Sequence, residues 1–241
     1  MVKLLLILVA TLKWGKLLTT GGTMLLAIAV YAMFWGWPFA AGFVVLMFIH
    51  EMGHYLAARQ RGLDVGGMFF VPFVGAAVTL NHGYSDVRTQ AYVAMAGPLA
   101  GTVGAVACYL LGRWTDSAML IAVAYSGLFL NLFNLLPVPM LDGGQITAIV
   151  SPRVWLVGAP VLVAVMLYRP SPILILIAVI SLPQLVKAWN YDPKAPENVR
   201  YYDVPLEARL EYGGFYLALT AYLAVMTYEL HETLQAVHPV S

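Results

Sequence analysis

Long apolar stretches separated by short polar segments dominate this chain of 241 residues. The stretch from Gly21 to Ile49 contains no charged residue, and the turn signal Gly36-Trp37-Pro38 divides it into spans near 22–35 and 39–58. Further apolar stretches lie near 91–111, 118–136, 154–168, 173–189 and 213–230. A helix needs about 20 apolar residues to cross a bilayer, and several of these stretches are shorter. The pattern predicts an all-α polytopic membrane protein with six transmembrane helices, or seven if every stretch crosses.

One apolar segment between the second and third spans has a different pattern. Residues 69–80 are rich in β-branched and aromatic side chains and are broken by Pro72 and Gly75, which is typical of short strands. A strand edge that faces lipid has no hydrogen-bond partner. We therefore expect a short membrane-associated β segment at 69–80 that packs against protein or lines a cavity.

The basic residues indicate an orientation in the membrane. If the N-terminus is cytoplasmic and each span crosses, only Arg113 and Arg169 among the 13 Lys and Arg residues lie outside. Lys and Arg concentrate on the cytoplasmic side of membrane proteins, so a cytoplasmic N-terminus and active-site opening are predicted. Residues 1–20 resemble a signal peptide but lack a small-residue cleavage site, and we interpret them as a retained interfacial helix or short strand.

Composition excludes several classes of protein. The chain is 61% apolar and 10% charged, whereas a soluble domain carries about a quarter charged residues, so a bilayer must solvate most of it. The net charge of +1 gives no reason to expect nucleic-acid binding. The longest polar stretch, about 190–211, is too short for a soluble domain. We expect one integral membrane domain over residues 1–241, with a core at about 40–150 and C-terminal helices at 154–232.

Ionisable residues stand inside the second span, at His50-Glu51-Met52-Gly53-His54. Positions i and i+4 share one face of a helix, so both imidazoles can bind a single metal ion, with Glu51 beside it and able to take a proton from water. Ionisable residues inside a span are costly and indicate function. The alternative is a pair of hydrogen-bonded histidines that stabilises helix packing, with Glu51 as their partner.

A catalytic zinc site takes three protein ligands and leaves one position open. The long zincin motif requires Gly and His where this chain has Ala57 and Gln60, so that class is excluded. Asp142 is the one acidic residue that adjoins a span within an apolar run, between two prolines and two glycines. Irregular backbone at membrane depth is tolerated where it lines a polar cavity. Asp142 is therefore a candidate ligand, and the alternative is an N-cap of a helix that begins near Gly143.

Two asparagines precede Asp142 near the end of the fourth span. Asn134 can hold a peptide carbonyl or stabilise the oxyanion of a tetrahedral intermediate, and the alternative is a hydrogen bond between helices. For Asn131, one turn earlier, the sequence favours only such a helix-to-helix hydrogen bond.

These motifs resemble those of the site-2 protease family of intramembrane zinc metalloproteases, in its compact prokaryotic subgroup without PDZ or CBS domains. The resemblance covers about residues 40–150. It rests on His50-Glu51-Met52-Gly53-His54, on the run from Asn134 to Gly143, and on Ala96-Gly97-Pro98-Leu99-Ala100-Gly101 at the start of the third core span. It implies that one zinc ion per chain is held by His50, His54 and Asp142. It also implies that Glu51 is the catalytic base and that Asn134 contacts the substrate backbone.

The function that this resemblance implies is hydrolysis of peptide bonds in or near transmembrane segments, that is, regulated intramembrane proteolysis in the cell membrane. The expected partners are a single-span or membrane-anchored protein substrate and the lipid bilayer, and no nucleic acid is expected. Formation of a homo-oligomer is compatible with the sequence. The segment 69–80 either receives an unwound substrate by strand pairing or is a structural plug. The rival hypothesis is a membrane metal transporter or zinc-binding protein without protease activity, which would need several metal sites in series. A membrane hydrolase with a non-peptide substrate also fits these residues.

Overall fold

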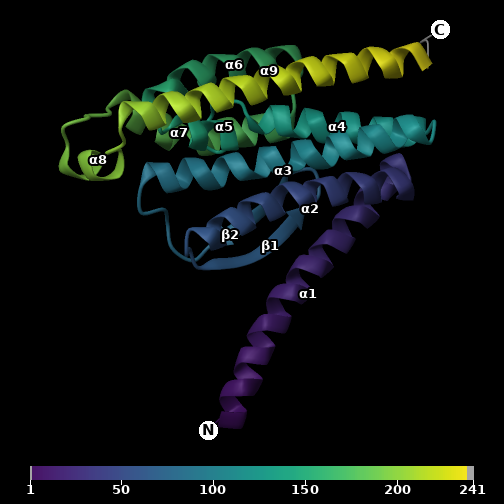
Figure 1. The fold of residues 1–241 in the computed structure, drawn as a ribbon, viewed down its shortest axis with the longest axis horizontal. Coiled ribbons are helices and arrows are strands. Elements are labelled where there is room, and N and C mark those ends of the chain that lie inside the picture. Colours follow the sequence, from purple (N-terminus) through teal and green to yellow (C-terminus); the bar gives the residue numbers. More distant parts are fainter. Residues whose placement is uncertain (1, 238–241) are drawn as a thin grey trace.

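The computed structural model describes residues 2–237, with side chains described from residue 18 onwards. It is mostly helical, with one small antiparallel sheet (Figure 1). In chain order the elements are α1 (Val2–Trp35), α2 (Trp37–Gln60), β1 (Val65–Val71), β2 (Gly75–Leu80), α3 (Val87–Trp114), α4 (Ala118–Asn134), α5 (Asp142–Thr147), the 3₁₀ turn η1 (Pro152–Val154), α6 (Trp155–Tyr168), α7 (Pro172–Trp189), α8 (Pro196–Tyr201) and α9 (Leu206–Val237).

Apolar helices make this chain a membrane protein, as its hydropathy pattern predicts. Within the described residues, four helices are long and apolar enough to cross a bilayer, namely α2, α3, α7 and the Leu18–Trp35 part of α1. Shorter apolar helices lie at Ala118–Asn134 and Pro152–Tyr168. The apolar stretch near 213–230 lies within α9.

The first two helices meet at the predicted turn. Gly36 has a φ of 82°, a left-handed conformation that glycine adopts without steric cost. Pro38 stands in the first turn of α2, where a backbone N–H would have no partner in any case. Residues 2–20 belong to α1, which runs unbroken to Trp35. The short-strand interpretation of the first 20 residues is therefore wrong, because no proline or turn interrupts the helix before Gly36.

The predicted β segment is a hairpin, and it starts earlier than expected, at Val65. Its register pairs Met68 with Val78 and Phe70 with Ala76. The outer edge of β1 is covered by α1: the hydroxyl of Thr20 donates to the Met68 carbonyl over 2.7 Å, and the hydroxyl of Thr23 accepts from the Phe70 N–H over 3.2 Å. Protein, rather than lipid, thus satisfies this edge, as a membrane environment requires.

Aromatic contacts hold the tip of the hairpin against the end of α1. Phe73 has a φ of 62°, which is unfavourable for a bulky residue. Its backbone N–H donates to the Tyr31 hydroxyl over 2.9 Å, and its ring packs edge-to-face on Tyr31 and Phe34. These contacts compensate the strain and fix the end of the hairpin.

The core of the molecule is formed by α2, α3, α4 and α9. Helix α3 lies against both α2 and α4, and α9 packs along α4 and α5, whereas the N-terminal part of α1 extends away from the other helices (Figure 1). Small residues let α2 and α3 approach closely, because a Cβ on Gly53 would collide with the Ala96 carbonyl and with Ala100. This close contact brings the middle of α2 next to the segment that follows α4.

Candidate metal centre

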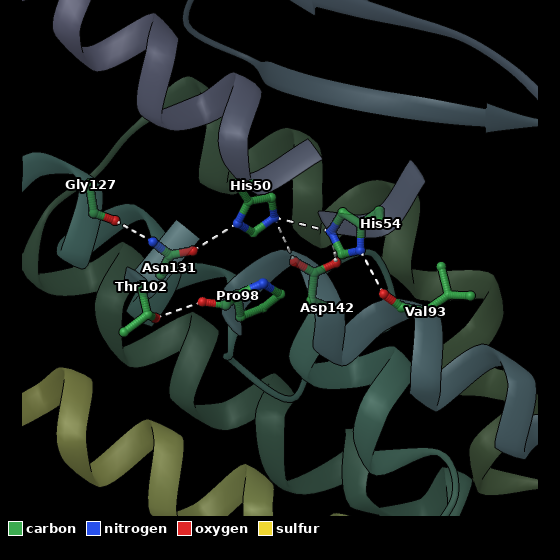
Figure 2. Close-up of polar contacts among 8 residues, drawn as sticks. All are labelled: His50, His54, Val93, Pro98, Thr102, Gly127, Asn131 and Asp142. Atoms are coloured by element: carbon green, nitrogen blue, oxygen red, sulfur yellow. Dashed lines mark hydrogen bonds and ion pairs between the residues drawn. The ribbon is translucent and has the colours of Figure 1, made fainter. Parts of the chain in front are cut away.

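Three side chains from two helices converge on one point (Figure 2). His50 and His54 project from consecutive turns of α2, and Asp142 is the first residue of α5. His50 Nε2 lies 3.1 Å from Asp142 Oδ2, and His54 Nε2 lies 3.3 Å from Asp142 Oδ1. One ligand atom from each residue lies within 4.8 Å of the other two. In the described part of the chain, this is the one group of three or more His, Cys, Asp or Glu residues with such a geometry.

The backbone around Asp142 explains why its carboxylate reaches the histidines. The N-cap of α5 is Leu141, and no side chain caps the helix, so the interpretation of Asp142 as an N-cap is wrong. The two following glycines are needed for the tight turn. A Cβ on Gly143 would collide with the Leu135 carbonyl, and one on Gly144 would collide with the Val138 carbonyl. The turn therefore directs the Asp142 carboxylate at the imidazoles.

Hydrogen bonds orient both imidazole rings. His54 Nδ1 lies 2.8 Å from the Val93 carbonyl oxygen, which can only accept, so Nδ1 carries the proton. His50 Nδ1 lies 2.8 Å from Asn131 Oδ1. The amide nitrogen of Asn131 already donates to the Gly127 carbonyl over 2.8 Å, so its oxygen accepts from His50. A neutral imidazole has one N–H, so in their neutral forms, which a metal ion requires, both rings direct a Nε2 lone pair towards Asp142.

This arrangement fits a metal ion. The two Nε2 atoms lie 3.1 Å apart, and with both protons on Nδ1 no hydrogen bond can join them. Two lone pairs and a carboxylate at such distances repel unless a cation lies among them. Two imidazoles and a carboxylate are also a usual ligand set of catalytic zinc. The partners of the two rings are Asn131 and Val93, so the alternative in which Glu51 is the histidines' hydrogen-bond partner is wrong.

Glu51 lies beside this centre without taking part in the group of three. Its side chain is buried, with 7% of the residue exposed, and its carboxylate accepts a hydrogen bond from the backbone N–H of Val78 on β2. Glu51, His50, His54 and Asp142 all line one cavity of about 360 Å³. A carboxylate in this position can exchange a proton with a water molecule or a substrate in the cavity.

The walls of the cavity are mostly apolar. One wall is β2 and the hairpin tip, and another is a face of α7 made of Ile173, Leu176, Ile177 and Ile180. Asn134, the last residue of α4, lines the cavity, and its amide makes no hydrogen bond within the described part of the chain. Asn134 is therefore available to a ligand in the cavity, and the helix-to-helix hydrogen bond considered for it is not formed.

Sequence reasoning missed two polar residues of the cavity, Tyr84 and Gln145. Gln145 follows Asp142 by one helical turn, so the direction of α5 could have indicated it. Tyr84 lies in the loop before α3 and gives no local signal. Burial, and secondly the negative charge of Asp142, raise the pKa of Tyr84 to about 12. Its hydroxyl therefore stays protonated at neutral pH and can donate a hydrogen bond.

Parts of the chain are similar to known proteins. Residues 38–115 match the profile of peptidase family M50. The protein named "Putative zinc metalloprotease Rip3" of Mycobacterium tuberculosis is 36% identical over 124 residues, which cover 46% of this chain and 31% of the relative. "Zinc metalloprotease MJ0392" of Methanocaldococcus jannaschii is 25% identical over 126 residues, which cover 50% of this chain and 36% of the relative. The chain thus spans about a third of the length of these relatives.

A solved structure, "Site-2 Protease from Methanocaldococcus jannaschii", aligns with a TM-score of 0.44 and 20% identity, covering 69% of this chain and 85% of that one. The family profile includes His50, Glu51 and His54 but ends before Asn134 and Asp142. Over residues 38–115 the chain is therefore similar to peptidase family M50.

Proposed function

We propose that this chain is an intramembrane zinc metalloprotease that hydrolyses peptide bonds in or near transmembrane segments of membrane proteins. The observation that carries the proposal is the convergence of His50, His54 and Asp142, with Glu51 beside them, in a cavity among apolar helices. Relatives named zinc metalloproteases support the same activity. We assign His50, His54 and Asp142 as ligands of one zinc ion, Glu51 as the catalytic base and Asn134 as a substrate-binding residue.

Each residue has a defined part in this reaction. Zinc, when bound by the three side chains, polarises a peptide carbonyl and makes water more acidic. The Glu51 carboxylate takes a proton from the attacking water and later returns it to the nitrogen of the leaving amine. The Asn134 amide N–H donates to the substrate carbonyl oxygen, where negative charge builds up. The apolar walls exclude bulk water, which strengthens these electrostatic interactions.

The substrate backbone is received by the cavity-facing edge of β2. Thr20 and Thr23 bind the outward backbone groups of Met68 and Phe70, whose partners across the hairpin are Val78 and Ala76. In an antiparallel pair, opposite residues direct their backbone groups either at each other or both outward. Val78 and Ala76 therefore direct theirs to the other edge, and both line the cavity. The Val78 N–H binds Glu51, so the backbone groups of Ala76 are the ones offered to a substrate. A substrate helix must unwind to expose its carbonyls, and an extended peptide pairs with such an edge.

Ala76→Pro tests this role of β2. Proline removes the outward N–H of residue 76 and leaves the bonds between β1 and β2 in place. We expect unchanged zinc content and a large loss of substrate cleavage. If β2 is a structural plug, as in the alternative, the variant cleaves substrate at the wild-type rate.

We further propose that residues 1–241 form one membrane domain, with the catalytic core at about 40–150 and C-terminal helices at 154–232. Helices α4, α6 and α9 supply the apolar segments that would bring the number of spans from four to six or seven. Arg59 near the end of α2 and Lys187 near the end of α7 support a cytoplasmic N-terminus and cavity opening in a cell membrane. The substrate is a single-span or membrane-anchored protein, and a homo-oligomer is compatible with this arrangement.

The decisive experiment combines metal analysis with cleavage assays. The purified protein should contain zinc near one equivalent and should cleave members of a panel of single-span proteins. Glu51→Gln should keep the zinc, because Glu51 is not a ligand, and should lose cleavage by about 100-fold or more. Cleavage by Glu51→Gln at the wild-type rate would contradict the proposal.

A metal transporter is the second candidate and is less well supported. Transport along a path needs several binding sites in series, whereas the described residues hold one group of potential ligands. Metal uptake into proteoliposomes that persists in Glu51→Gln would favour the transporter.

A further inference from the structure

The side chain of Asn131 lies at the Nδ1 edge of the His50 ring, on the side away from Asp142 (Figure 2). We propose that Asn131 is a positioning residue, which holds His50 in the orientation and tautomer that direct its Nε2 lone pair at the metal. This inference rests on the proposed function, because it assumes that the three side chains bind zinc.

The contacts of Asn131 use both ends of its amide. Asn131 is 1% exposed and lies on the buried face of α4. Its oxygen accepts from His50 Nδ1 and its nitrogen donates to the Gly127 carbonyl, each over 2.8 Å. The second bond prevents the amide from turning over, because a reversed amide would present a donor to Nδ1 and an oxygen to the carbonyl. Gly127 therefore determines which end of Asn131 faces His50.

Helix α3 leaves space for this support. A Cβ on Gly101 would collide with the Asn131 amide, and a Cβ on Gly97, one turn earlier, would collide with the His54 ring. The neighbouring hydroxyl of Thr102 does not compete for the amide, because it donates to the Pro98 carbonyl over 2.6 Å (Figure 2). The two glycines thus form a groove on α3 in which Asn131 and His54 lie.

The two histidines are held in different ways. His54 is oriented by the backbone carbonyl of Val93. A substitution at residue 93 changes the side chain and leaves this carbonyl in place. His50 depends on the side chain of Asn131, and His50 is itself only 2% exposed. Without an acceptor its Nδ1–H would be buried without a partner, and the ring could move its proton to Nε2. Loss of such a supporting partner typically lowers metal affinity by about 10–100-fold.

The test compares zinc affinity among full-length variants in detergent, measured by competition with a chromophoric chelator. Asn131→Leu should bind zinc about 10–100-fold more weakly than wild type. Asn131→Asp keeps an acceptor oxygen opposite His50 Nδ1 and should recover most of the affinity. Asn134→Leu is the matched control, because Asn134 belongs to the same helix and makes no hydrogen bond to His50. It should leave zinc affinity unchanged.

A second measurement keeps the test informative if Asn131→Leu does not fold. In protein labelled with ¹⁵N-histidine, the zinc-loaded wild type should show a proton on His50 Nδ1, and Asn131→Asp should shift this resonance without shifting that of His54. Wild-type affinity in Asn131→Leu, equal losses in the Leu and Asp variants, or an unprotonated His50 Nδ1 would overturn the inference. These results would leave the proposed function intact, whereas a wild type that binds no zinc would overturn both.

Discussion

His50 Nε2 lies 3.1 Å from Asp142 Oδ2, although the two residues belong to helices that are far apart in the sequence. Both are shielded from solvent, with side-chain exposures of 3% and 12%. A carboxylate at this depth needs a positive partner, because an isolated buried charge is very unfavourable. Neutral imidazoles do not supply that charge, whereas a cation bound by both residues does, and the pair is therefore suited to hold a common metal ion.

Removing the carboxylate charge should release the metal. Asp142→Asn keeps the size of the side chain but loses a negatively charged ligand, so zinc affinity should fall by more than the roughly 100-fold typical of a supporting partner. Metal analysis after dialysis against a chelator measures this change. Full zinc content in the double variant His50→Ala with Asp142→Ala would exclude the proposed ligand set.

Asn134 should affect the reaction and not the metal. If its amide stabilises the oxyanion, Asn134→Ala should lower kcat by about 100–1,000-fold, with a much smaller change in KM. Steady-state kinetics on a cleavable single-span substrate separate the two constants. Loss of zinc from Asn134→Ala would instead indicate a role in the metal centre.

The groove on α3 gives a prediction about packing. Gly97→Ala places a methyl group against the His54 ring, so we expect a loss of about 1–3 kcal/mol of stability together with weaker zinc binding. The matched control is Gly214→Ala on α9, where a Cβ meets no atom within 4 Å and alanine favours the helix. Thermal unfolding of both variants with and without zinc checks this, and equal stability of the two would contradict the predicted clash.

The start of α3 should depend on pH. The Asp86 carboxylate accepts from the Thr89 backbone N–H over 2.8 Å and from the Thr89 hydroxyl over 2.9 Å. Burial alone would raise the pKa of Asp86, but these hydrogen bonds and one from Ser85 lower it below its usual value. A carboxyl whose pKa is depressed by folding stabilises the fold above its unfolded pKa, near 3.9, and this contribution is lost as the pH falls through the folded pKa.

Two substitutions test this cap. Asp86→Ala should lower stability by about 1 kcal/mol at neutral pH, and the difference from wild type should shrink in acid. Asp86→Asn keeps the capping oxygen and should remove the pH dependence. Unfolding curves at neutral pH and near pH 3 measure both effects. A difference between Asp86→Ala and wild type that is as large in acid as at neutral pH would contradict the role of the charge.

Arg209 should stabilise the segment behind Asp142. Its guanidinium donates to the carbonyls of Ile149 and Val150, just after α5, and to those of Val204 and Tyr202, before α9. Lysine cannot reproduce this fork of donors, so Arg209→Lys should cost about 1–3 kcal/mol through unpaired carbonyls. Arg200→Lys is the control, since Arg200 is exposed. Equal unfolding temperatures for the two variants would show that the fork contributes nothing.

Local patterns predicted the parts of the fold that depend on neighbouring residues. The turn at Gly36 and the strand character of 69–80 follow from residue types within a few positions. The earlier start of β1 was hidden, because Gly66 and Gly67 carry no side chain to show the alternation of a strand. The state of residues 1–20 was ambiguous because their pattern fits an interfacial helix as well as a short strand.

By itself, the sequence determined that this is an apolar, membrane-embedded chain and that His50 and His54 share a helix face, because both properties depend on composition and on the period of a single helix. Only the tertiary structure decided that Asp142 faces these histidines instead of capping α5, and that Asn131 bonds to His50. Aspartate and asparagine are suited to either role. The role of each residue depends on the relative positions of α2, α4 and α5. These positions are determined by the close packing at the glycines of α3 and by the turn at Gly143.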